Sequence, residues 1–161
     1  MRTFQGDMIG SGLRFAIIGS RFNELITGKL IQGATDTLAR HGVSFTDMDL
    51  FWAPGAWEQP VVAKEIALTG KYDAIICLGA VIRGETTHHE YVAGEAAKGL
   101  AHIGLEHRVP VAFGILTCDN LEQALMRSGS KAGNKGAEAA LAALETANLI
   151  KEIHSLEANK D

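Results

Sequence analysis

Four short segments hold the side chains that could do chemistry, and each follows an apolar run. They cover residues 20–23, 53–58, 83–90 and 117–120 and carry aromatic, carboxylate, hydroxyl and imidazole groups. In an open parallel sheet, ligands bind beyond the carboxyl ends of the strands, because each strand turns there into a loop and a helix. If the apolar runs are such strands, these four segments meet at one edge of the sheet and can form a binding site.

The third segment offers an anion site beside a proton carrier. Gly84 permits an irregular turn, and Thr86 and Thr87 provide hydroxyls and amides just before a helix start, where a phosphate can bind. His88 follows at once, and an imidazole can both take and give protons near neutrality. The run of His88, His89 and Glu90 could also suggest a metal site. However, adjacent residues point in different directions and no further ligand cluster follows, so we predict no metal.

Aromatic and acidic residues mark the first two segments. Phe22 could be partly buried under the following helix, or it could be a stacking platform for a flat heterocycle. Glu58, close after Pro54 and Gly55, could be an ordinary first-turn acid of a helix. It could equally accept hydrogen bonds from the hydroxyls of a sugar.

The segment 126–136 is rich in glycine and carries three cations, Arg127, Lys131 and Lys135. It is not a Walker loop, because the required spacing of glycine, lysine and Ser/Thr is absent. One interpretation is a solvated basic loop. The other is a phosphate site in which Arg127 binds bidentately while a lysine adds positive charge.

The elements that must position these residues follow from the apolar pattern. The runs at 13–19, 47–52, 74–82 and 110–117 are typical of buried strands. Helical spacing predicts helices over about 23–41, 57–69, 91–107, 120–127 and 136–153. Alternating strands and helices indicate the α/β class, with a parallel sheet and right-handed crossovers. Residues 2–5 are weakly strand-like and could be an arm that pairs with another subunit, or a frayed end.

Composition limits the class of protein. A chain of 161 residues with 47% hydrophobic and 21% charged residues predicts one domain with one core, and buried subunit contacts. A formal net charge of -4 argues against a nucleic-acid partner. No secretion signal and no stretch of ~20 apolar residues is evident, so we expect no membrane association and a cytoplasmic location. Cys77 and Cys118 lie at apolar runs and are expected to be buried free thiols.

Taken together, these motifs resemble the lumazine synthase family over nearly the whole chain. The matching pieces are residues 21–23, 54–58, 79–84, 86–88, 113–114, Arg127 and 131–136. The resemblance implies a flavodoxin-like three-layer sandwich over a single domain of residues 1–161. This domain would contain a four-stranded parallel sheet, helices on both faces and an N-terminal arm of residues 1–12 that pairs with a neighbouring subunit. It also implies active sites between adjacent subunits of a pentamer. The short linker 128–135 resembles that of capsid-forming members and predicts a hollow icosahedral particle of sixty subunits, with riboflavin synthase as a further partner.

The resemblance also implies roles for individual residues. Phe22 would stack on a pyrimidine ring, and the ring and its ribityl chain would contact Ala56, Trp57, Glu58, Ala80, Val81, Ile82 and, from the neighbouring subunit, Phe113. The phosphate of the second substrate would contact Thr86, Arg127 and the backbone N–H of Glu85. His88 would transfer protons, with Asn23 and Lys135 in supporting roles.

The implied reaction joins 5-amino-6-(D-ribitylamino)uracil to 3,4-dihydroxy-2-butanone 4-phosphate and gives 6,7-dimethyl-8-ribityllumazine, phosphate and water. It is the penultimate step of riboflavin biosynthesis, and it calls for neither a metal nor an organic cofactor. Two other classes of function stay open from the sequence. One is a flavodoxin-like module that binds a flavin or nucleotide without turnover, and the other is a purely structural shell protein.

Overall fold

Four parallel strands form the central sheet of the computed structural model, which describes residues 1–158, so the last three residues of the predicted domain lie outside it. The strands are β1 (Phe15–Ser20), β2 (Met48–Ala53), β3 (Ala74–Ile82) and β4 (Val111–Cys118), in the order β2-β1-β3-β4. Each predicted apolar run overlaps its strand. The α/β class and the parallel sheet are therefore confirmed.

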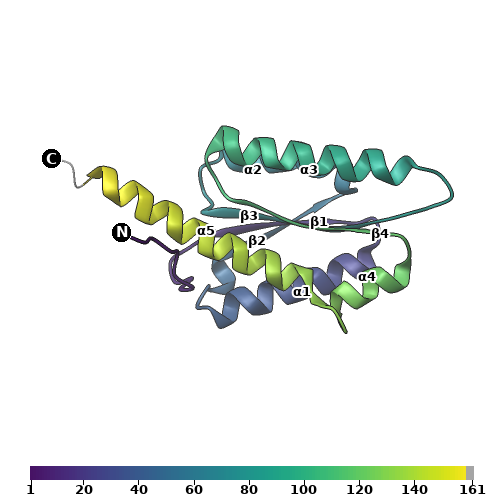
Figure 1. Cartoon of the computed structure of the whole chain (residues 1–161), viewed down its shortest axis with the longest axis horizontal. Coiled ribbons are helices and arrows are strands. Elements are labelled where there is room, and N and C mark those ends of the chain that lie inside the picture. The colour runs from purple at the N-terminus through teal and green to yellow at the C-terminus, as the bar shows by residue number, and fades with distance from the viewer. Residues whose placement is uncertain (159–161) are drawn as a thin grey trace.

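Helices cover both faces of the sheet and complete a three-layer, flavodoxin-like sandwich. They are α1 (Glu24–Arg40), α2 (Gln59–Leu68), α3 (His88–His107), α4 (Leu121–Arg127) and α5 (Lys135–Ala158). Helices α2 and α3 lie on one face, while α1, α4 and α5 lie on the other (Figure 1). Strands β2 and β4 form the two edges of the sheet.

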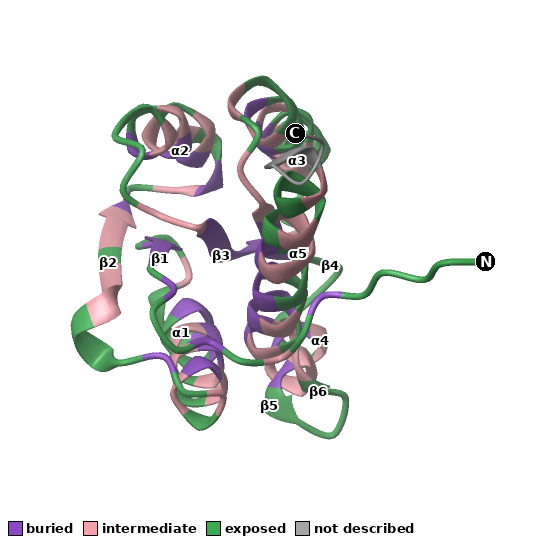
Figure 2. Ribbon diagram, turned by 90° about the vertical axis from the view of Figure 1, so that its left-hand side faces the viewer, coloured by how far each residue is buried: buried purple, intermediate pink, exposed green. Residues whose placement is uncertain are grey.

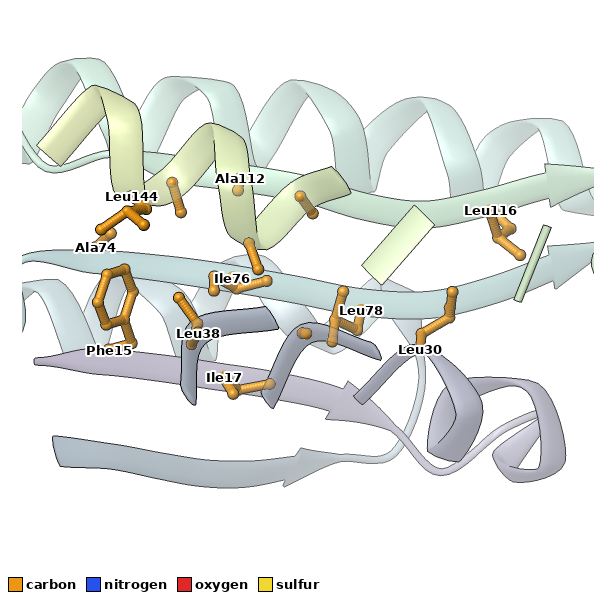
Figure 3. Packing of buried hydrophobic residues seen from close by; sticks show 14 of the residues in the cluster. Phe15, Ile17, Leu30, Leu38, Ala74, Ile76, Leu78, Ala112, Leu116 and Leu144 are labelled. Carbon is orange, nitrogen blue, oxygen red and sulfur yellow. The ribbon is translucent and has the colours of Figure 1, made fainter. Parts of the chain in front are cut away.

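Strand periodicity divides the core into two hydrophobic clusters, because successive side chains point to opposite faces. Phe15 and Ile17 pack on the side of α1 and α5, whereas Ala16 and Ile18 pack on the side of α2 and α3. Figure 3 shows Phe15 and Ile17 with Leu30 and Leu38 of α1 in the first cluster. Burial on both faces explains why the central strands β1 and β3 appear in the sequence as continuous apolar runs.

Several predicted boundaries were wrong. Helix α3 begins at His88 rather than near Tyr91, because its first turn is polar and the apolar stripe begins only later in the helix. Helix α2 is preceded by a 3-10 turn, η2 (Ala56–Glu58), and α5 extends beyond residue 153 to Ala158. A second 3-10 turn, η1 (Phe45–Asp47), precedes β2.

The linker between α4 and α5 also has structure of its own. It contains a short antiparallel hairpin of β5 (Ser128–Ser130) and β6 (Gly133–Asn134), with positive φ angles at Gly129 and Gly133. The Asn134 side chain caps α5 by accepting hydrogen bonds from the backbone N–H of Gly136 and Ala137. It also donates to the carbonyl of Lys29 in α1, which fixes the hairpin against the body of the fold.

The N-terminal segment is attached to the fold only in part. The Asn148 side chain donates to the carbonyls of Asp7 and Ile9, and thus holds this part of the segment on α5. Residues 1–5 are exposed and form no strand within the chain, and Figure 2 shows the terminus extending away from the sandwich. Pairing of this arm with another subunit stays a prediction.

Two further observations bear on the sequence analysis. Cys77 and Cys118 are free and buried, as predicted, and burial raises the pKa of both thiols, so both favour the neutral form. Within residues 1–158, none of the helices combines the length and apolar character that crossing a bilayer requires.

Candidate active site

A cavity of about 490 Å³ opens at the carboxyl ends of β1 and β3. The chain leaves β1 toward β2 on one side, and later returns to β3 on the other side of β1. Ligands bind in parallel sheets at this kind of topological switch point. We call the hollow the switch-point cavity; its lining residues are Phe22, Asn23, Pro54, Gly55, Ala56, Trp57, Glu58, Ala80, Val81, Ile82, Gly84, Thr86, His88, His89 and Val92.

Phe22 presents its ring to this cavity. The backbone N–H groups of Arg21 and Phe22 donate to the carbonyls of Ala53 and Pro54, at 2.9 and 3.0 Å, so the loop after β1 is fixed to the loop after β2. The side chain of Phe22 is 74% exposed. The alternative of burial under α1 is therefore wrong, and the ring is available to stack on a planar ligand.

Asn23 fixes the same loop from the other side. Its backbone has a φ of 59°, in the left-handed region that Asn tolerates better than most residues. Its side-chain Nδ2 donates to the carbonyl of Ala80 at 2.8 Å, and its own carbonyl accepts the first hydrogen bonds of α1, from Ile26 and Thr27. Asn23 thus joins the exit of β1 to β3.

The turn after β2 supplies a second aromatic group and a carboxylate. Trp57 is 56% exposed, while Ala56 is buried and Glu58 is half-buried. A Cβ atom on Gly55 would lie 3.2 Å from Oε2 of Glu58, so glycine leaves room for this carboxylate beside the turn. A carboxylate in such a cavity can accept hydrogen bonds from the hydroxyls of a polyol chain.

The far end of the cavity is suited to an anion. Gly84, Thr86 and His88 line it at the N-terminus of α3, where the helix dipole and the first backbone N–H groups favour negative charge. The Thr86 hydroxyl accepts a long hydrogen bond, 3.4 Å, from the backbone N–H of His88, and the His88 side chain is exposed. Glu85 belongs to the same loop and is exposed, but it does not line the cavity.

The other predicted phosphate residues lie elsewhere in the chain. A second hollow, of about 360 Å³, lies beside edge strand β4; its lining includes Phe113, Thr117, Arg127, Lys135 and Glu138. We call it the outer-edge hollow. Phe113 is 46% exposed, Arg127 Nη1 donates to the carbonyl of Gln123 at 3.1 Å, and Lys135 pairs with Glu138 at 2.7 Å.

The two hollows share no lining residue. A single chain therefore brings Phe22, Glu58 and His88 together, but it does not bring Phe113, Arg127 or Lys135 to them. Among residues 1–158, no three His, Cys, Asp or Glu side chains are grouped so that they could hold a metal ion. The run of His88, His89 and Glu90 accordingly gains no further ligand from the fold.

The fold and the site together define the class of protein, which is a flavodoxin-like α/β protein with a cavity at the switch point. An exposed phenyl ring, an imidazole and a helix N-terminus all line this cavity. Within that class, a family model described as 6,7-dimethyl-8-ribityllumazine synthase matches residues 12–151, and the chain belongs to this family. The protein is accordingly a transferase of riboflavin biosynthesis that condenses 5-amino-6-(D-ribitylamino)uracil with 3,4-dihydroxy-2-butanone 4-phosphate. The family implies small-molecule substrates and an oligomeric assembly.

Proposed function

We propose that the active site is composite, and that the switch-point cavity of one subunit is completed by the outer-edge hollow of its neighbour. The observation that carries this proposal is the separation of the candidate residues within one chain. The residues suited to a planar ring and a polyol line one hollow, while the half-buried cations Arg127 and Lys135 line the other. The reaction needs both sets at one place, because the ketose phosphate must meet the amine of the pyrimidine.

This arrangement requires a head-to-tail contact between two different surfaces of identical subunits. A contact of this type closes into a ring when the rotation between subunits divides a full turn. The ring we propose is a pentamer, as the resemblance implies. Phe113, which is exposed at the edge strand, then lies against the pyrimidine half of the adjoining site.

The pyrimidine half is formed by the switch-point cavity. Phe22 stacks on the ring, Trp57 and Glu58 hold the ribityl chain together with Ala56, and the backbone of residues 80–82 contacts the uracil edge. Strand pairing supports this last role: the register of β1 with β3 ends at Gly19 and Leu78, while β3 continues to Ile82. Backbone groups of β3 beyond the end of β1 can therefore face a ligand.

The phosphate half combines groups from both subunits. Thr86 and the backbone N–H of Glu85 contribute the neutral donors at the N-terminus of α3, and Arg127 of the neighbour contributes a charged, bidentate donor. Lys135 supports it with a second positive charge, although in the single chain this lysine is paired with Glu138. Asn23 supports the pyrimidine half by holding the Phe22 loop.

The chemistry follows from these groups. The amine of the pyrimidine substrate attacks the ketone of the butanone phosphate, so the protein itself needs no nucleophile. Water leaves to give an imine, phosphate is eliminated, and a second condensation closes the ring. His88 carries protons between these steps, and the donors around the phosphate stabilise the departing anion. Holding two reactants in contact supplies the rest of the rate increase.

Direct assay tests this function against the passive alternatives. The purified protein is mixed with both substrates, and the fluorescence of the lumazine product is followed with time. A catalyst gives a linear rise that depends on protein concentration. A module that only binds flavin or nucleotide, or a shell protein, gives no rise above the uncatalysed reaction.

The larger assembly is a second part of the proposal. Only the short hairpin of β5 and β6 lies between α4 and α5, and this short connection supports the predicted icosahedral particle of sixty subunits built from pentamers. Sedimentation velocity distinguishes such a particle from free pentamers. The exposed residues 1–5 are proposed to pair with an adjacent subunit. The proposed partner of the assembly is riboflavin synthase, and its proposed location is the cytoplasm.

A further inference from the structure

Gln59 is a fully buried polar residue directly behind the switch-point cavity. It follows Glu58 in the chain, begins α2, and has 0% of its surface exposed. Its Nε2 donates to the hydroxyl of Ser20 at 2.7 Å and to the carbonyl of Leu78 at 2.8 Å. Its Oε1 has no hydrogen-bond partner among residues 1–158. Since buried acceptors are normally paired and an unpaired one lowers stability, core packing alone does not account for this amide.

The position of Leu78 explains what the amide does. The ladder between β1 and β3 ends at Gly19 and Leu78, because β1 stops at Ser20 while β3 continues to Ile82. Carbonyls two residues apart on a strand point the same way, so those of Leu78 and Ala80 lie along one edge. Gln59 donates to the first of these carbonyls and Asn23 donates to the second. Two side-chain amides thus replace the missing strand as donors.

Gln59 also connects three elements that surround the cavity. Through Ser20 it contacts the last residue of β1, through Leu78 it contacts β3, and its own backbone begins α2 next to Glu58. The site is tightly packed: a Cβ atom on Gly79 would lie 2.7 Å from the Ser20 hydroxyl and 3.5 Å from Nε2 of Gln59. A shift of this amide would therefore displace Glu58 relative to the Phe22 loop and the β3 backbone.

We propose that Gln59 is a positioning residue that sets the geometry of the pyrimidine half of the cavity, an inference that rests on the function proposed above. It acts through Ser20 and Leu78 and does not line the cavity itself. Its effect should be confined to the ribitylaminouracil, because the phosphate half is built from the start of α3 and from the outer-edge hollow. Among residues 1–158, the Gln59 side chain forms no hydrogen bond with either of these parts.

The test is Gln59→Leu, which keeps similar volume but removes both donations and the unpaired acceptor. Binding of ribitylaminouracil, measured by titration calorimetry, should weaken about tenfold, since small displacements of positioned groups are costly. The KM for the butanone phosphate should stay within about twofold, and the melting temperature should fall by no more than a few degrees. Ser20→Ala, which removes one of the two acceptors, should weaken the same binding by a smaller factor.

The matched control is Ile66→Val, a small truncation near the other end of α2 and in the same hydrophobic cluster. It should lower the melting temperature while leaving ribitylaminouracil affinity unchanged. Unchanged affinity in Gln59→Leu, or equal loss for both substrates, would overturn the inference. If Gln59→Leu does not fold, Ser20→Ala decides in its place by the same criterion. A wild-type protein that binds the pyrimidine but forms no lumazine would overturn the proposed function instead, because the pyrimidine affinity is measured by calorimetry without turnover.

Discussion

The side chain of Asn23 donates a hydrogen bond of 2.8 Å to the carbonyl of Ala80, and so joins the loop after β1 to the part of β3 that β1 no longer covers. The adjacent Phe22 ring is exposed and lines the same cavity as residues 80–82, whose backbone we assign to the uracil edge. Asn23→Gly keeps the left-handed backbone accessible and removes only the amide. We expect it to lower the free energy of unfolding by about 1 kcal/mol and to weaken ribitylaminouracil binding severalfold.

Asn23→Ala serves as the comparison for that variant, because it removes the same amide but also places an ordinary side chain at a φ of 59°. It should cost about 1 kcal/mol more in a chemical denaturation experiment, with the same loss of affinity. Equal stability of the two variants would contradict the importance of the left-handed conformation. Unchanged affinity in both would contradict the role of the amide.

His88→Ala should slow turnover by about a hundredfold and leave pyrimidine affinity nearly unchanged, since proton transfer is lost while stacking on Phe22 is kept. Stopped-flow measurement of lumazine formation gives the rate, and calorimetry gives the affinity. His102→Ala is a suitable control, because His102 lies on the exposed face of α3 and does not line the cavity. A variant of His88 with wild-type turnover would remove the histidine from the mechanism.

Arg127→Ala should chiefly raise the KM for the butanone phosphate, by roughly tenfold or more, because a charge-assisted pair with the phosphate is lost. Lys131→Ala provides the control: Lys131 is an exposed cation of the same linker, but it does not line the outer-edge hollow. Steady-state kinetics with each substrate varied in turn distinguishes the two variants. Equal KM values in wild type and Arg127→Ala would exclude this phosphate contact.

Tyr72 gives the fold a predicted response to alkaline pH. Its hydroxyl donates to Asp49 at 2.7 Å, and desolvation together with this carboxylate raises the pKa of Tyr72 above its ordinary value. A raised pKa in the folded state favours the protonated phenol, so this stabilisation is complete below about pH 10 and is lost as the pH rises through the folded-state pKa. Because the group is partly exposed, Tyr72→Phe should cost only about 0.5–1 kcal/mol near neutrality.

Urea denaturation of wild type and Tyr72→Phe at two pH values tests this sign. The difference in unfolding free energy should be larger at about pH 8 than at about pH 11, because only the wild type loses a phenol hydrogen bond on titration. A difference that grows with pH would show that the Tyr72 hydroxyl is not favoured in its protonated form. Activity near neutrality should be unchanged, since Tyr72 lies away from both hollows.

The sequence predicts most of the fold because burial of the central strands β1 and β3 on both faces produces apolar runs that are easy to recognise. It also predicts which loops meet, since the carboxyl ends of parallel strands share an edge. The start of α3 was not predicted, because a polar first turn gives no hydrophobic periodicity. For residues 128–134 the sequence predicts only a linker and not the observed hairpin, because the short glycine-containing strands bury little apolar surface.

Two features of the site do not follow from the sequence. Gln59 looks like an ordinary polar residue near a helix start, and only its complete burial and its contacts with Ser20 and Leu78 indicate a role. His88 and Arg127 lie in different hollows, and the sequence does not predict this separation. Spacing along the chain does not specify which edge of the sheet a helix end will reach.

Subunit complementation tests the composite site most directly. Chains carrying His88→Ala and chains carrying Arg127→Ala are each assayed alone, then unfolded, mixed in equal amounts and refolded into mixed assemblies. A site built from two subunits predicts recovery to about a quarter of wild-type activity, because random mixing places an intact switch-point cavity beside an intact outer-edge hollow at one interface in about four. Activity that stays at the level of the two separate variants, although mixed assemblies have formed, would contradict a site shared between subunits.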